Sequence, residues 1–228
     1  MPRISVVIPA YNRARYLDTA AATVLAQTWS DLELIIIDDG SQDNTPDVCG
    51  RLCEYDSRVR YIRHENKGLP AARNTGIRAA TGEFIALLDS DDFWAPTKLA
   101  KQLDLFARDQ TLGVVYCDWA SIDQSGHVSQ GVNPPDFSLP SLYEALLFDN
   151  VVHGSASAVL IRATCFDQVG LFDESLRANE DWDMWLRTAE HYQFAKVPEV
   201  LVYLLQHSDQ MQRAPLRMAD SMMRRLRN

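Results

Sequence analysis

The sequence predicts an α/β fold in which a doubly wound, mostly parallel central sheet has helices on both faces. Over residues 1–95, four strand-like segments are separated by three helix-like segments, an order typical of parallel sheets built from right-handed β-α-β units. Two of these strand-like segments, Leu32–Ile37 and Phe84–Leu88, are nearly all apolar, as expected for strands covered on both faces. Beyond residue 95 the alternation is lost, which predicts a mixed α+β second half.

The remaining elements of the first half follow from local patterns. Ile4–Ile8 is a short β-branched run, and apolar residues then recur at helical spacing over Tyr16–Leu25. Thr45–Pro46 combines a hydroxyl N-cap with proline at the first helical position. Val59–Ile62 is predicted as the third strand, and Leu69–Ala80 as the third helix.

The second half contains fewer regular signals. Leu99, Leu103 and Phe106 predict a helix, and a further helix begins near Glu180. Residues 131–140 are rich in proline and polar residues and are predicted to form a loop. Four segments are predicted as strands: Val114–Ser121, Ser157–Ile161, Phe194–Val197 and Val200–Leu205.

Composition and charge exclude several classes of protein. The net charge of −9 argues against non-specific nucleic-acid binding, which requires a basic surface. The four cysteines form no C-x-x-C pair, and we expect them to be small, buried or half-buried side chains in a reducing compartment. We see no signal peptide and no apolar run of about 20 residues. We therefore expect a cytoplasmic protein.

Three carboxylates in the run Leu88-Asp89-Ser90-Asp91-Asp92 follow the fourth strand. Their mutual repulsion must be offset, and a divalent cation can do this. Ligand sets made of oxygen suit Mg²⁺ or Mn²⁺, which commonly also bind substrate phosphates. The alternative is an acidic turn that caps a helix. With other acids at the same edge of the sheet, the metal site is the preferred interpretation.

Other polar residues are predicted to lie at this edge. Asn12 follows the first strand and Asp39 the second, and ligands bind beyond the carboxyl ends of parallel strands. Lys67 and Arg73 flank a helix start, which suits an anion such as a diphosphate. Each signal alone also fits an ordinary solvated turn or surface helix.

A second acidic pair, Glu180–Asp181, opens a helix with two tryptophans. An acid at a helix start is normal capping, but a carboxylate desolvated by aromatic side chains is also suited to act as a general base. His207 is a candidate for the metal or diphosphate site and His153 for the acceptor site, although a lone histidine is more often structural or exposed than a ligand.

Taken together and in order, six motifs resemble the family 2 glycosyltransferases, an inverting group with the GT-A fold, which is Rossmann-like. The resemblance covers roughly residues 3–190. Its motifs are Val6–Asn12, Ile36–Ser41, Asn66–Gly68 with Ala72–Gly76, Gly82–Ile85 leading into Leu88–Asp92, Val169–Glu174 and Asn179–Trp182.

The resemblance implies a role for each matching position. Asp181 would be the catalytic base, and Glu180 is the less favoured base. Asp91 would bind the metal, Mn²⁺ or Mg²⁺, with Asp89 and His207 as further candidate ligands. The nucleotide-sugar donor would contact Pro9, Ala10, Tyr11, Asn12, Asp39, Lys67, Gly68, Arg73, Asp89 and Ser90.

The predicted function is transfer of a single sugar, with inversion, from a nucleoside diphosphate sugar, preferably UDP-linked, to a hydroxyl of a saccharide or lipid-linked acceptor. We expect one GT-A domain over 1–210, with a donor half at 1–95 and an acceptor half at 96–210. The basic tail 211–228 could form an amphipathic helix on the inner face of the membrane, or a solvated terminus. Cell-surface polysaccharide synthesis is the expected context.

Two alternatives stay open. A nucleotidyltransferase would be expected to carry a glycine-rich phosphate-binding run near its N-terminus, which residues 9–12 do not provide. A non-catalytic nucleotide-sugar-binding module would have no need for Asp89, Asp91 and Asp181 together.

Overall fold

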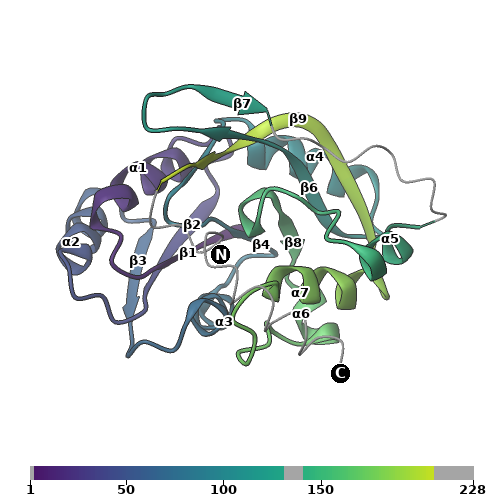
Figure 1. Ribbon diagram of the computed structural model, residues 1–228, viewed down its shortest axis with the longest axis horizontal. Helices are drawn as coiled ribbons and strands as arrows, with labels where there is room; N and C mark the ends of the chain where they lie inside the picture. Colours follow the sequence, from purple (N-terminus) through teal and green to yellow (C-terminus); the bar gives the residue numbers. More distant parts are fainter. Residues whose placement is uncertain (1–2, 131–140, 208–228) are drawn as a thin grey trace.

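The structure is a computed structural model that describes residues 3–130 and 141–207 of the chain. Within these residues a nine-stranded sheet runs through the molecule, and helices cover both of its faces (Figure 1). The strands lie in the order β3-β2-β1-β4-β8-β6-β9-β5, and β7 pairs with β6 outside this path. The predicted α/β fold with a doubly wound, mostly parallel sheet is confirmed.

The first half of the sheet is entirely parallel. β1 (Ile4–Ala10) lies between β2 (Leu32–Asp38) and β4 (Phe84–Leu87), and β3 (Val59–Arg63) extends the sheet beyond β2. Every residue of β1, β2 and β4 is buried. Their apolar sequences therefore reflect burial on both faces, as predicted.

Helices from both halves of the chain share the two faces of the sheet. On one face pack α1 (Ala14–Leu25), α2 (Thr45–Tyr55) and α4 (Lys98–Arg108). The other face is covered by α3 (Leu69–Ala79), α5 (Leu142–Phe148), α6 (Thr164–Val169) and α7 (Glu180–Ala189). Neighbouring residues of one strand serve different layers: Val6 packs with the first group and Val7 with the second.

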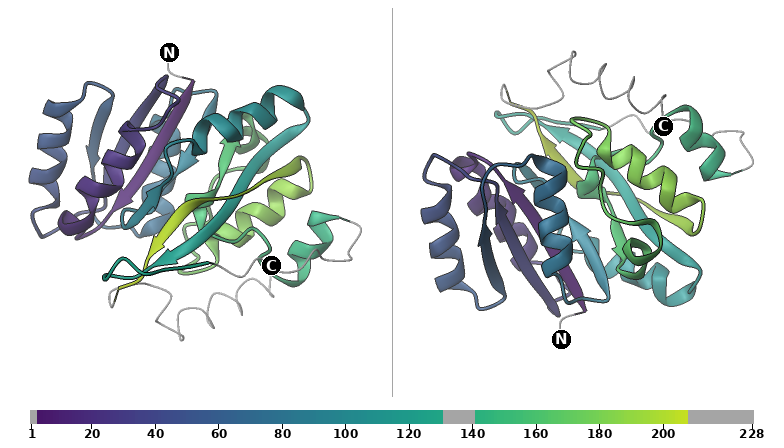
Figure 2. Two further views of the ribbon diagram at one scale, coloured as in Figure 1. Left: turned by 90° about the horizontal axis from the view of Figure 1, so that it is seen from above. Right: turned by 90° about the horizontal axis from the view of Figure 1, so that it is seen from below.

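The second half of the sheet is mixed. β8 (Leu160–Arg162) is antiparallel to both β4 and β6 (Leu112–Ile122), whereas β9 (Gln193–Leu205) runs parallel to β6. Figure 2 shows β6 and β9 side by side as a long twisted pair that crosses the molecule next to the first half. The short strand β5 (Asp92–Trp94) pairs with β9 at the end of the sheet, and the short strand β7 (Val128–Gln130) pairs with β6.

Two predicted strands were wrong in their extent. Phe194–Val197 and Val200–Leu205 are parts of one strand, β9, whose register against β6 shifts between Cys117 and Asp118. The strand continues because the ladder shift leaves Pro198, which has no N–H to donate, outside the pairing.

The predicted strand Ser157–Ile161 begins instead as a short 3₁₀ turn, η1 (Ala156–Ala158), before β8. The predicted cap of α2 was also wrong. Thr45 is the first helical residue and Asn44 holds the N-cap position, so the Thr45 hydroxyl donates to Asp43 rather than capping the helix.

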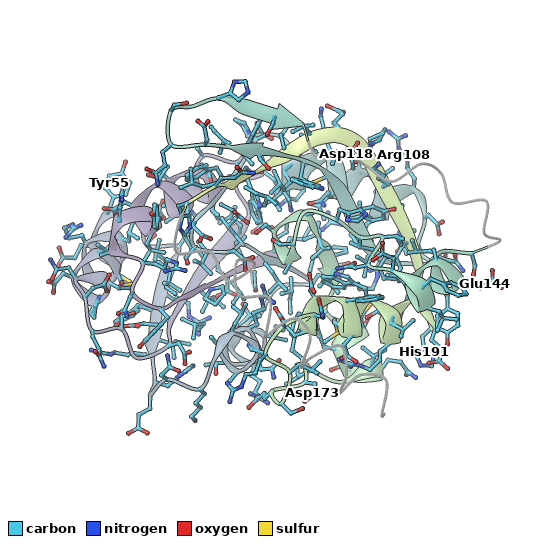
Figure 3. The ribbon with its side chains drawn as sticks, viewed as in Figure 1. Tyr55, Arg108, Asp118, Glu144, Asp173 and His191 are labelled. Atoms are coloured by element: carbon cyan, nitrogen blue, oxygen red, sulfur yellow. The ribbon has the colours of Figure 1, made fainter. Side chains whose placement is uncertain are left out.

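The interior accommodates the four cysteines as free thiols, three of them buried and Cys53 half-buried, as expected. Other side chains are exposed to solvent: Tyr55 at the end of α2 is 83% exposed, and His191 lies exposed beyond α7 (Figure 3). In the described ranges 3–130 and 141–207, none of the helices combines the length and apolar character that crossing a bilayer requires.

Gly76 allows α3 to lie very close to β1. A Cβ placed on Gly76 would lie 2.2 Å from Val7 Cγ1, so alanine fits only if the helix and the strand move apart. We expect Gly76→Ala to lower the free energy of unfolding by about 1–3 kcal/mol, the usual cost of overpacking a core. Urea denaturation measures this change directly.

Gly50 in α2 provides the matched control. It is also a helical glycine, but a Cβ there would meet no heavy atom within 4 Å. Gly50→Ala should raise the free energy of unfolding by about 0.5–1 kcal/mol, because alanine has the higher helix propensity. A loss of stability in both variants would contradict the packing argument.

Candidate active site

The predicted polar residues do converge on one edge of the sheet. Asn12 follows β1, Asp38 ends β2 and Asp39 follows it, and Asp89 lies just beyond β4. Because β1, β2 and β4 are parallel neighbours, their carboxyl ends lie together. The edge divides into a hydrogen-bonded loop cluster around Asp39 and an acidic cluster around Asp89.

Asp39 organises the loop that leads into α3. Its Oδ1 accepts from the backbone N–H of Lys67 at 2.7 Å, and its Oδ2 accepts from that of Gly68 at 2.9 Å. The side chain of Asn66 donates to the Asp39 carbonyl at 3.0 Å. Gly68 has φ of 95°, a left-handed conformation that glycine adopts without strain. Asp39 thus brings Lys67 and Gly68 to the end of β2, although the two segments are distant in sequence.

Asp38 and Asn12 stabilise the neighbouring loops. Asp38 is fully buried and accepts from the hydroxyl of Tyr61 at 2.8 Å and from the Ser41 N–H at 2.8 Å. Asn12, at φ 54°, accepts from the N–H of Gln42, while its own N–H donates to the Ser41 hydroxyl. Asn12 therefore joins the loops after β1 and β2.

Arg73 connects the two acidic segments that the sequence places far apart. Its Nη1 donates to Glu180 Oε1 at 2.6 Å, and its Nη2 donates to Asp89 Oδ1 at 2.8 Å. Its side chain is only 2% exposed and lies over the ring of Phe172. Arg73 therefore fixes the N-terminus of α7 against the end of β4.

A second residue of α3 holds the chain that precedes α7. Asn74 exchanges two hydrogen bonds with the backbone of Phe172, each of 2.9 Å, and also donates to Glu174. The adjacent motif residues Arg73 and Asn74 thus anchor both α7 and its approach.

Asp181 lies at the first turn of α7, beside the Arg73 clamp, by which we mean the ion pairs of Arg73 with Asp89 and Glu180. Its Oδ1 accepts from the Trp182 N–H at 2.7 Å. Burial raises the pKa of Asp181 to about 6, with the charge of Glu180 adding to the increase and that of Arg73 opposing it. A carboxylate with this pKa is largely ionised near neutral pH and is still basic enough to accept a proton. Glu180 is instead paired with Arg73.

Asp91 lies in a separate polar contact with the end of β9. His207 Nε2 lies 2.8 Å from Asp91 Oδ2, and Arg13 Nε lies 3.7 Å from the same oxygen. His207 is buried and stacks on Tyr16, with ring centroids 4.8 Å apart. His207, a candidate for the metal or diphosphate site, therefore lies in direct contact with the acidic run.

The donor set at Asp91 fits a divalent cation that is shared with a substrate. Among the residues described, three or more His, Cys, Asp or Glu side chains are nowhere arranged to enclose a metal ion. Mg²⁺ and Mn²⁺ in nucleotide sites usually take one or two protein carboxylates and complete their shell with phosphate oxygens and water. Asp91, with His207 beside it, can supply the protein ligands of such a metal ion, and substrate and water would supply the rest.

Asp92, the last acid of the run, has a different environment. It is buried and accepts from the Ser157 hydroxyl at 2.6 Å. Burial, followed by the charges of Asp89 and Asp91, raises its pKa well above the ordinary range for a carboxyl group. Asp92 therefore belongs to the packing beneath the acidic run.

The remaining predicted residues lie around the same edge of the sheet. Pro9 and Ala10 are buried at the end of β1, and Tyr11, which follows them, is 43% exposed. Ser90 is buried beside Asp89. His153 is half-buried, and burial lowers its pKa.

Comparison with known proteins decides the family. Residues 5–170 match the family described as Glycosyl transferase family 2, which covers well over half of the chain. The chain belongs to glycosyl transferase family 2. The predictions of a family 2 glycosyltransferase and of its fold are confirmed.

Relatives and solved structures agree with this assignment. The chain is 33% identical over 210 residues to a chondroitin synthase from Escherichia coli, covering 92% of this chain and 30% of that protein. It resembles S. aureus TarS in complex with UDP at a TM-score of 0.75, with 18% identity over 96% of this chain and 63% of that one. It also resembles PcManGT, a mannosyltransferase from Pyrobaculum calidifontis in complex with GDP-Man and Mn²⁺, at a TM-score of 0.75, with 24% identity over 100% of this chain and 65% of that one.

The curated relatives compared are longer proteins, of which this chain spans between 21% and 58% of the length. The family and fold are thus established at the level of the domain. The solved structures share the GT-A architecture with it.

Sequence reasoning missed several residues that shape the site. Arg13 contacts Asp91, and Ser155 and Ser157 contact the Asp89–Asp92 run. Arg13 follows Asn12 directly, so its position after β1 could have indicated it. The serines lie in the irregular second half, where no local pattern places them beside β4.

Proposed function

We propose that this family 2 glycosyltransferase moves one sugar per catalytic cycle from a nucleoside diphosphate sugar to an acceptor hydroxyl, with inversion at the anomeric carbon. The new bond joins the acceptor oxygen to the anomeric carbon, and the bond from that carbon to the diphosphate oxygen breaks. The acceptor proton passes to Asp181, and the nucleoside diphosphate leaves.

The observation that supports this proposal best is the Arg73 clamp. By binding Asp89 and Glu180 at 2.8 and 2.6 Å, Arg73 joins the acidic run Asp89–Asp92 to α7, the helix that presents Asp181. A general base for an inverting transfer must stand near the donor and must be ionised at working pH. Asp181 meets the second requirement through its pKa of about 6, and the clamp supports the first.

Within this proposal, Asp91 is the metal ligand, with His207 and Asp89 as contributors. A bound Mn²⁺ or Mg²⁺ would neutralise charge on the departing diphosphate. The chain itself would orient the diphosphate through Lys67 and the positive end of the α3 dipole.

The nucleobase would lie beside Pro9, Ala10, Tyr11 and Asp39. A carboxylate accepts hydrogen bonds and donates none when ionised. Asp39 therefore suits uracil, thymine or guanine, each of which carries a ring N–H that can donate to it. We infer a UDP-sugar, with GDP- and dTDP-sugars as the other donors compatible with this carboxylate.

The acceptor is proposed to be a saccharide or a glycolipid, held by the second half of the chain. The chondroitin synthase relative supports a saccharide. The basic tail 211–228, which we expect to contact the membrane if the acceptor is lipid-linked, lies outside the described residues, as does the loop 131–140.

Release of nucleoside diphosphate tests the proposed reaction without a known acceptor. The purified protein would be incubated with UDP-, GDP- and dTDP-sugars, with Mn²⁺ or with EDTA. We expect release of one diphosphate that requires the metal and is abolished in Asp91→Ala. Absence of release together with absence of metal-dependent nucleotide binding in calorimetry would overturn the proposal in favour of a binding module that has lost catalysis.

His207 provides a finer test of the metal assignment. We expect His207→Ala to raise the Mn²⁺ concentration that gives half-maximal activity by about 10- to 100-fold, as loss of a metal ligand or of its orienting partner does. His191→Ala, which alters an exposed histidine beyond α7, is the matched control and should leave this concentration unchanged. Equal metal titrations for all three proteins would remove His207 from the metal site.

A further inference from the structure

Two serines of the segment before β8 contact Asp89, the first carboxylate of the acidic run Asp89–Asp92. Ser155 Oγ donates to Asp89 Oδ2 at 3.0 Å. Ser157 Oγ accepts from the Asp89 N–H at 3.0 Å and donates to Asp92 Oδ2 at 2.6 Å. The side chain and the backbone of Asp89 are therefore held by two residues of one short segment.

Ser157 is the anchor of this segment. It is fully buried, and its carbonyl accepts from the indole N–H of Trp94 at 2.9 Å. The chain from Asp89 to Trp94 thus bonds to Ser157 at three points. These contacts bind the turn η1 to the end of β4.

Ser155 has the freer hydroxyl but the less favourable backbone. Its φ of 56° and ψ of −173° lie in a region that is essentially restricted to glycine. It follows Gly154, which has φ of 90° and packs against Trp119. A serine at this position is strained, so the fold alone would favour glycine there.

The hydrogen-bond inventory explains what the serine supplies. A hydroxyl has one hydrogen to donate. Ser155 can direct its hydrogen to Asp89 Oδ2 while its oxygen accepts from the Ser157 N–H at 3.1 Å. The other Asp89 oxygen is bound by Arg73. Arg73 and Ser155 therefore hold the Asp89 carboxylate from both oxygens.

We propose that Ser155 is a positioning residue whose strained backbone is retained so that its hydroxyl, together with Arg73, fixes the Asp89 carboxylate in the orientation that the diphosphate and metal require. The inference rests on the proposed donor site. Ser155 acts through Asp89, and Ser157 supports it by anchoring the loop.

Ser155→Gly separates the hydroxyl from the backbone, because glycine removes the hydroxyl and also relieves the strain. Ser155→Ala removes the hydroxyl and keeps the strain. We expect both variants to weaken UDP binding in the presence of Mn²⁺ by about 10-fold, since hydrogen bonds to charged groups are among the stronger ones. Thermal midpoints should rank Ser155→Gly above Ser155→Ala.

Calorimetry with UDP and Mn²⁺ is the decisive measurement, made in the wild-type and Asp89→Ala backgrounds. If Ser155 acts through Asp89, Ser155→Gly should change the dissociation constant less than threefold once Asp89 is alanine. Ser125→Gly is the matched control, because Ser125 also donates to an aspartate, Asp123, but in an exposed turn. It should leave UDP binding unchanged.

The outcomes separate this inference from the function on which it rests. If the wild-type protein binds UDP and Ser155→Gly binds it with the same affinity, the role of Ser155 is overturned and the donor site stands. An equal loss in both backgrounds would show that Ser155 acts elsewhere than on Asp89. Absence of metal-dependent UDP binding in the wild-type protein would overturn the donor site for UDP, and the role of Ser155 with it.

Discussion

Asp181→Asn is expected to lower the turnover number by about 10²- to 10⁴-fold, the usual contribution of a general base. The amide retains the oxygen that accepts from Trp182, so the start of α7 should keep its structure. In the wild-type protein, burial raises the pKa of Asp181 to about 6. Turnover should therefore fall about tenfold per pH unit below pH 6, measured as diphosphate release with saturating donor and acceptor.

The same substitution should make the protein more stable. The folded state binds the Asp181 proton more tightly than the unfolded chain does, so stability is lost as pH rises from the ordinary carboxyl range, near 3.8, to about 6. At pH 8 the full cost is present, and Asp181→Asn should recover up to about 3 kcal/mol of it. Urea denaturation at pH 8 and pH 4 should show a gain that shrinks at the lower pH.

Asp183→Asn is the control for both effects. Asp183 lies in the same helical turn but pairs with Arg187 at 2.8 Å, away from the clamp. Its loss should change turnover less than threefold and give no gain in stability. If Asp181→Asn retained wild-type turnover, the base would have to be another group, with Glu180 the first to test.

Much of the donor-side fold could be predicted because its signals are local. Strands β1, β2 and β4 are buried on both faces, and this produces the apolar runs from which they were predicted. Parallel pairing then places Asp39 and Asp89 at one edge without any further information. The three helices between these strands were also predicted, and only the N-cap of α2 was misplaced.

The connections between the halves could not be predicted, because they depend on strand order. β8 enters the sheet between β4 and β6 and thereby brings Ser155 and Ser157 to Asp89. Nothing in the residues around Ser155 predicts a left-handed backbone at a serine, since that conformation is imposed by its surroundings. Likewise, the separation of 107 residues between Arg73 and Glu180 exceeds the reach of any local pattern.

Arg73 gives the largest expected effect on stability. Burial lowers its pKa, but the charges of Asp89 and Glu180 hold it above its ordinary range, so the guanidinium stays charged at any working pH. Arg73→Met would leave two buried or half-buried carboxylates close together without a cation. We expect the free energy of unfolding at pH 8 to fall by about 3–5 kcal/mol, the usual cost of removing one partner from a buried pair.

Arg73→Lys should not restore the clamp. An ammonium group is a single point charge and lacks the planar fork that reaches two carboxylates at once. We expect it to recover part of the stability but to leave turnover at least tenfold below wild type, because α7 would no longer be held to β4 in one geometry. Arg78→Met controls for the loss of an arginine from α3, since Arg78 is exposed and lies 3.8 Å from Glu174. That variant should change stability by less than about 0.5 kcal/mol.

A compensated variant distinguishes electrostatics from packing. If the loss in Arg73→Met comes from the uncompensated acids, adding Asp89→Asn and Glu180→Gln should restore most of the stability, because buried charge networks can often be replaced by neutral groups at little cost. Activity should not return, because the acidic run Asp89–Asp92 has lost a carboxylate and α7, which carries Asp181, has lost its ion pair with Arg73. If the triple variant were as unstable as Arg73→Met, the guanidinium would act mainly through its packing on Phe172, and the electrostatic account of the clamp would be wrong.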